Sequence, residues 1–177
     1  MLKLRWDIFE SRDVVRLLSI PERELRYWAV LGIVKPDLGE AVGRPGIRRR
    51  YSFRNLVQAG LVQTLLANHI SLHTAPTILR FVGLTGFFLQ KPNQLHLILH
   101  HGDLLQAYVC YQKGRDRMTT GMPGKLTDLT HLPSRSLGKH LDALLEDPNE
   151  RDSLIVIAAH RIRDRLATAL GRTLADL

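Results

Sequence analysis

The run Arg48-Arg49-Arg50-Tyr51 places three consecutive guanidinium groups beside an aromatic ring. A second group further toward the N-terminus combines Arg23 and Arg26 with Tyr27. Guanidinium groups bind phosphate oxygens through charge-assisted hydrogen bonds, often two at a time. Both groups therefore predict contact with a polyanion, and nucleic acid is the polyanion that uses such contacts most widely.

The spacing of these residues predicts which of them act together. Residues three apart on a helix share a face, so Arg23 and Arg26 point to one side. If the arginine run is a strand, Arg48 and Arg50 face one side and Arg49 the other. Two alternatives remain open for the arginines: they contact DNA, or they form a solvated face with carboxylate partners. Glu22 either complements the helix dipole, which we favour, or accepts a hydrogen bond from a cytosine amino group.

The charge of the whole chain supports a polyanionic partner. The 177 residues carry a formal net charge of +8, with 25 Lys and Arg against 17 Asp and Glu. Residues 1–90 hold 13 of these bases and 7 of these acids, a net of +6, so the positive charge belongs mainly to the first half. Such a distribution favours nucleic-acid binding by that half.

Other classes of protein find little support in the sequence. No apolar run is long enough to span a membrane, and the N-terminal residues do not resemble a secretory signal. A single cysteine, Cys110, suits a reducing cytoplasm, so we expect a cytoplasmic, nucleoid-associated protein. No nucleophile–base motif, P-loop or dinucleotide motif is present, and we expect no enzyme and no cofactor. His96, His100 and His101 are too weakly patterned to predict a metal site.

The first half of the chain reads as short helices around a Gly- and Pro-rich segment. Ser11 is the expected cap of a helix from Arg12 to Leu18, and a tight turn leads to a second helix from Glu22 that stops at Gly32. Two helices joined in this way form a helix–turn–helix, whose second helix enters the major groove. Residues 35–47 are expected to form a β wing. Two more helices follow, Phe53–Leu66 behind Ser52 and Thr74–Phe81 behind Ser71.

The second half predicts a small sheet with helices. Leu95–Leu99 and Leu104–Tyr111 flank His101-Gly102-Asp103 as a β-hairpin, and 115–132 holds one or two further short strands. A helix is expected over 136–146 and another over 151–174, although Leu154–Ile157 can equally be a buried strand. We expect the last helix to pack on the hairpin or on a twofold mate. The fold class is α+β, with domains at 1–88 and 89–177.

Taken together, the first half resembles the MerR-type winged helix–turn–helix family. The blocks that carry the resemblance occur in the family's order and near its spacing: Arg12-Asp13-Val14-Val15-Arg16-Leu17-Leu18, Ile20-Pro21, Glu24-Leu25-Arg26-Tyr27-Trp28, Leu31-Gly32-Ile33-Val34-Lys35-Pro36, Arg49-Arg50-Tyr51-Ser52 and Ile70-Ser71-Leu72. The resemblance implies a dimeric regulator that binds a pseudo-palindromic operator. It also implies that Tyr51 packs or hydrogen-bonds against the helices and touches the DNA backbone.

The sequence departs from the family in three places, one of which is a wing that is longer than usual through Gly39 to Gly46. Asn68-His69 stands where relatives usually have glycine, and Asn tolerates the left-handed conformation. Gly83, Gly86 and Pro92 interrupt the long dimerising helix of the family, so we expect homodimerisation through the C-terminal domain instead.

The sequence therefore predicts a sequence-specific regulator of transcription that binds double-stranded DNA through a recognition helix and a basic wing. The alternatives are a protein-binding adaptor or antitoxin-like partner with secondary DNA binding, and an architectural factor that bends DNA. Transcription machinery or another protein is a further expected partner, and the effector is unknown. The predicted DNA-binding residues are Arg12, Arg23, Arg26, Tyr27, Arg48, Arg49, Arg50 and Tyr51.

Overall fold

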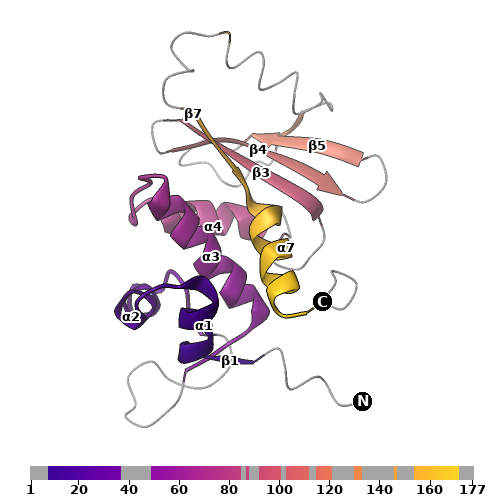
Figure 1. The fold of residues 1–177 in the computed structure, drawn as a ribbon. Helices are drawn as coiled ribbons and strands as arrows, with labels where there is room; N and C mark the ends of the chain where they lie inside the picture. Colours follow the sequence, from indigo (N-terminus) through magenta and orange to yellow (C-terminus); the bar gives the residue numbers. More distant parts are fainter. Residues whose placement is uncertain are drawn as a thin grey trace. The chain divides into compact units, whose positions relative to one another are not determined.

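The computed structural model describes residues 8–36, 49–84, 87, 92–100, 103–111, 115–120, 130–132, 146 and 154–171 (Figure 1). Contacts divide the chain into two compact units, one of residues up to 63 with those from 162 onward, the other of residues 64–161. Helices dominate the first unit, and a five-stranded sheet dominates the second. The mixed α+β class expected from the sequence is confirmed.

The first unit begins with two short helices, α1 (Ser11–Leu18) and α2 (Glu22–Val30). Helix α1 starts one residue earlier than predicted, because the Asp13 carboxylate accepts a hydrogen bond from the Glu10 N–H at 3.0 Å and makes Glu10 the cap in place of Ser11. Ser19, at φ 53°, ends α1. Gly32, at φ 72°, follows α2 as predicted, in a left-handed conformation that glycine adopts without strain.

The first unit also contains two short strands and a long helix. Strand β1 (Phe9–Glu10) pairs antiparallel with β2 (Arg50–Tyr51), with Phe9 opposite Tyr51. Helix α3 (Phe53–Ala67) begins with reciprocal hydrogen bonds, in which Ser52 N–H donates to Asn55 Oδ1 at 3.2 Å and Asn55 N–H donates to Ser52 Oγ at 3.3 Å. Ser52 is therefore the N-terminal cap of α3, as predicted.

The C-terminal helix α7 (Ala159–Ala169) contributes residues to the core of the first unit. Ile162 and Leu166 are buried, and their side chains meet α3 at Gly60. A Cβ placed on Gly60 would lie 2.9 Å from Ile162 Cγ2, 3.4 Å from Leu18 Cδ2 and 3.5 Å from Leu166 Cδ1. Ile162 and Leu166 of α7 thus pack on α3 within this unit, while the expected packing of the last helix on the hairpin or on a twofold mate stays a prediction.

The second unit contains helix α4 (Ala75–Leu84) and a sheet. His69, at φ 61°, is the left-handed residue before α4. The sequence had suggested Asn68 for this conformation, but the Asn68 side chain instead donates a hydrogen bond to the Thr64 carbonyl at 2.8 Å. Ser71 Oγ accepts a hydrogen bond from the Thr74 N–H at 3.2 Å, as expected of a cap.

The sheet contains β3 (Pro92–His100), β4 (Asp103–Tyr111), β5 (Arg115–Thr120), β6 (Thr130–Leu132) and β7 (Leu154–Ala158). All strand pairs are antiparallel, in the order β6-β5-β4-β3-β7. The predicted hairpin is present, with an irregularity between Ile98 and Leu99. Residues 154–158 form a strand that pairs with β3, which settles the open choice between strand and helix. The helix expected over 136–146 lies outside the described residues, apart from a turn at Glu146.

Candidate nucleic-acid interface

Helix α2 has one face in the core and the opposite face in solvent. Leu25, Trp28 and Ala29 are buried, with 2% exposure or less. Because an α-helix turns by about 100° per residue, the residues opposite this apolar stripe are those at positions 23, 26, 27 and 30. All four are exposed. Packing of α2 onto the core is therefore what presents the predicted recognition residues.

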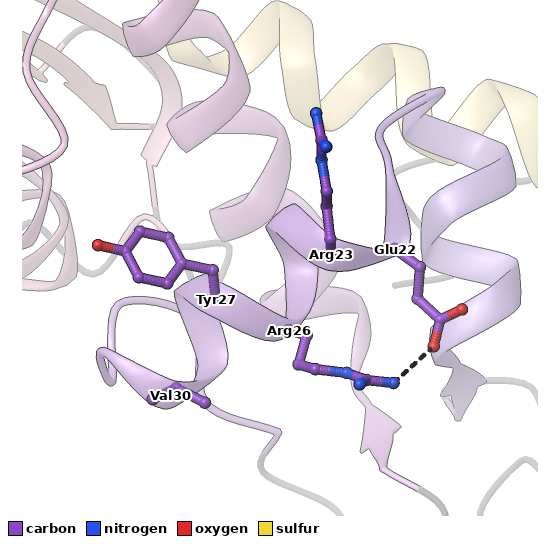
Figure 2. A pocket seen from close by; sticks show the side chains of 5 residues that line it. All are labelled: Glu22, Arg23, Arg26, Tyr27 and Val30. Carbon is purple, nitrogen blue, oxygen red and sulfur yellow. Dashed lines mark ion pairs between the residues drawn. The ribbon is translucent and has the colours of Figure 1, made fainter.

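These side chains surround an open pocket of about 430 Å³, lined by Glu22, Arg23, Arg26, Tyr27 and Val30 (Figure 2). Figure 2 shows Arg26 and Glu22 pointing toward each other, whereas Arg23 and Tyr27 extend from the helix in other directions. The face thus combines two cations, one aromatic hydroxyl and one aliphatic side chain. We call it the α2 face.

Two of the predicted DNA-binding arginines have carboxylate partners. Arg26 pairs with Glu22 at 3.5 Å, and Arg12 pairs with Glu10 at 3.2 Å. For these two arginines the structure thus shows the carboxylate partners of the second alternative. Arg26, Glu22 and Arg12 are exposed and Glu10 is partly exposed, and surface pairs of this kind contribute only about 0.2–1 kcal/mol. Either arginine can therefore exchange its carboxylate for a phosphate at little cost, while Glu22 also complements the N-terminus of α2.

The residues next to the wing alternate across strand β2. Arg50 is exposed and Tyr51 is fully buried, while Arg49 is partly buried just before the strand. Arg48 lies outside the described residues. Arg23 and Arg50 make no ion pair among the residues that the structure describes, so both guanidinium groups face solvent.

Tyr51 lies close to the starts of α1 and α2, where Ser11 and Glu22 both act on its phenol. Burial raises the pKa of its phenol, while the nearby Ser11 hydroxyl and Arg49 guanidinium oppose that rise, and the Glu22 carboxylate adds to it. The Tyr51 Oη atom makes no hydrogen bond within the described part of the chain. The buried ring thus packs on the helices, and its proposed contact with DNA stays a prediction.

Asn55 anchors the segment that leads into the wing, and sequence reasoning missed it. Its side chain is 3% exposed and donates a hydrogen bond to the Lys35 carbonyl at 2.8 Å. The Ser52-x-x-Asn55 spacing, typical of a helix start, was the available signal. Val30, 63% exposed on the α2 face, is the second residue that sequence reasoning missed.

The histidines do not assemble into a metal site among the described residues, where no group of three potential ligands occurs. His96 on β3 and His160 at the start of α7 stack edge to face, with ring centroids 4.7 Å apart. His160 Nδ1 lies 3.1 Å from the Leu95 carbonyl oxygen. Burial, followed by the charges of His160 and Arg161, lowers the pKa of His96 to about 4. His96 is therefore neutral at physiological pH, and its contact with His160 is structural.

Comparison with known proteins decides what the first half of the chain is. Residues 9–81 match the MerR HTH family regulatory protein family. Residues 9–81 form a MerR-family helix–turn–helix domain. The match spans α1, α2, both short strands, α3 and most of α4, so the resemblance inferred from the sequence is confirmed.

Distant relatives agree with this assignment. A stretch of 65 residues of this chain is 34% identical to uncharacterised HTH-type transcriptional regulators of Mycobacterium bovis and Mycobacterium tuberculosis. That stretch is 37% of this chain and 28% of each relative, so the chain spans less than a third of the length of the relatives it matches. No helix among the described residues is long and apolar enough to cross a membrane.

Proposed function

We propose that the protein is a sequence-specific transcriptional regulator, and not an enzyme, that binds double-stranded DNA as a homodimer. The observation that carries the proposal is the α2 face: a MerR-family domain buries Leu25 and Trp28 and leaves two arginines, a tyrosine and a valine exposed on the opposite side. A helix of this kind fits the major groove, where the exposed side chains reach base edges.

The arginines divide into two roles in this proposal. Arg23, which extends from α2 without an acidic partner among the described residues, is the best placed to read a base, because guanidinium groups pair with the O6 and N7 atoms of guanine. Arg12, Arg26, Arg49 and Arg50, with Arg48 beside them in the sequence, bind phosphates and fix the register of the domain. Tyr27 donates its hydroxyl to a phosphate, and Tyr51 holds the wing against the helices.

Competition binding with duplex DNA tests the proposal. We expect the Arg49→Ala/Arg50→Ala variant to lose affinity for all sequences and to show a smaller salt dependence, by about one in the log–log slope for each phosphate contact removed. If about six phosphates are neutralised, the wild-type affinity falls about a thousandfold between 50 and 200 mM salt. Arg165→Ala, an exposed arginine on α7, is the matched control. Unchanged affinity in the double variant would refute a role for the wing.

Homodimerisation is a separate part of the proposal. Two copies bound to a pseudo-palindromic operator bring two α2 helices to successive major grooves. We place the dimer contact in residues 89–177 and the protein in the cytoplasm with the nucleoid, where transcription machinery is its further partner. Sedimentation of the full chain should show a dimer at micromolar concentration. If the protein is a monomer both in the absence of DNA and when bound to it, the proposed homodimerisation is wrong.

A further inference from the structure

Val30 is an aliphatic residue in a place that packing does not explain. It is 63% exposed, although the three buried residues of the same helix show that α2 is well packed on its other side. Val30 lies about two helical turns from Arg23 on the same side of α2. Arg26, on the adjacent turn, also lines the same pocket. The valine thus lies at the C-terminal end of the α2 face, on the same pocket as both arginines.

The surroundings of Val30 indicate what covers it. Two arginines favour a polyanion, because an apolar partner surface would desolvate both charges and would give Arg23 no acidic partner. Phosphates satisfy the arginines but leave the valine uncovered. The major groove of B-DNA supplies both chemistries, because the thymine C5-methyl group is the apolar group it presents. RNA does not, since its major groove is too narrow for side chains and uracil lacks the methyl group.

We propose that Val30 is a specificity-determining residue that reads a thymine methyl group in the operator half-site. This inference rests on the proposed DNA binding and adds the identity of one base. The contact is of ordinary hydrophobic strength. Burying one methyl group contributes a factor of about four in affinity, so one thymine per half-site changes binding by about fourfold.

The test replaces the methyl group without touching any hydrogen bond. Sequences bound by the full-length protein are first selected from random duplexes, and each thymine of the selected duplex is then replaced by deoxyuridine in turn. In each half-site we expect a single thymine whose replacement weakens wild-type binding by about fourfold. In Val30→Ala, whose exposed site makes folding insensitive to the change, the same replacement should have no effect.

The controls separate failure of this inference from failure of the proposed function. Leu31→Ala removes a neighbouring exposed side chain that does not line the pocket, and it should keep the wild-type response to deoxyuridine. Specific binding that is insensitive to every replacement overturns thymine reading while the proposed function stands. An equal response in wild type and Val30→Ala overturns the assignment to Val30. If no sequence is selected, the proposed function itself fails.

Discussion

Replacing Gly60 by alanine should destabilise the first unit, although the same change stabilises most helices. Alanine is about 1 kcal/mol more favourable than glycine within a helix. At Gly60 the added Cβ would lie 2.9 Å from Ile162 Cγ2, a distance at which one of the two atoms must move. Ile162 is buried and β-branched, so its χ1 angle has little freedom to respond. The packing penalty therefore exceeds the gain in helix propensity.

The magnitude follows from these two opposing terms. Overpacking a core costs about 1–3 kcal/mol, and the stiff neighbour places Gly60 in the upper part of that range. After subtraction of the propensity gain, we expect a net loss of about 1–2 kcal/mol. For a chain of this size, that corresponds to a melting temperature lower by about 2–8 °C.

Tryptophan fluorescence reports on the affected unit directly. Trp28 is 1% exposed in the core, and a Trp6→Phe background leaves it as the only tryptophan of the chain. Urea and thermal unfolding of Gly60→Ala are compared with the parent in that background.

A double-mutant cycle identifies the cause of the loss. Ile162→Ala removes the Cγ2 atom and by itself costs about 2–5 kcal/mol. In the Ile162→Ala background, Gly60→Ala should instead raise stability by about 1 kcal/mol, because only the propensity term remains. A stabilising effect of Gly60→Ala in the parent would refute the close packing of α3 and α7 at this point.

Three further predictions concern single side chains. Tyr51→Phe should leave stability within about 1 kcal/mol of wild type, because the buried Oη atom makes no hydrogen bond within the described residues, and urea unfolding beside a DNA titration shows whether the hydroxyl matters for either property. Ser19→Gly and His69→Gly should each raise stability by about 1 kcal/mol by relieving a positive φ, and calorimetry that shows a loss would contradict this. His96 has a folded-state pKa of about 4, so between pH 6.5 and 4 its imidazole is protonated in the unfolded chain but not in the folded one. The stability it contributes is complete above pH 6.5 and is lost as pH falls toward 4, so circular dichroism should show a steeper loss in wild type than in His96→Gln, and parallel curves would argue against the shift.

Local patterns in the sequence predicted the elements that carry the α2 face. The apolar spacing of Leu25, Trp28 and Ala29 defines the buried side of α2 and, by difference, the exposed one. Gly32 and Ser52 marked helix ends because their chemistry is specific to those positions. The ion pair of Glu22 with Arg26 could also have been read from its four-residue spacing, which is a common pairing distance on helices.

Contacts between distant segments could not be predicted in the same way. Gly60 in the middle of a helix carries no sign that Ile162 lies against it, since that contact joins residues about a hundred positions apart. The cap of α1 is Glu10 because the Asp13 carboxylate accepts the Glu10 N–H, whereas the residue preferences that led to Ser11 do not favour glutamate at this position. The boundary near residue 88 and the dimer contact in residues 89–177 stay predictions, because they depend on packing that local patterns do not encode.

The structure separates the residues that hold α2 in place from those that α2 presents. Loss of 1–2 kcal/mol at Gly60 still leaves nearly all molecules folded if the unit has an ordinary stability of about 5–15 kcal/mol. Unfolding then cannot lower DNA affinity measurably at 25 °C. Conversely, Val30 and Arg23 contribute little to the core, so changes there should alter affinity without altering stability. A Gly60 variant that loses affinity while remaining folded would therefore indicate that the contact between α3 and α7 sets the orientation of the α2 face, and not only the stability of the unit that carries it.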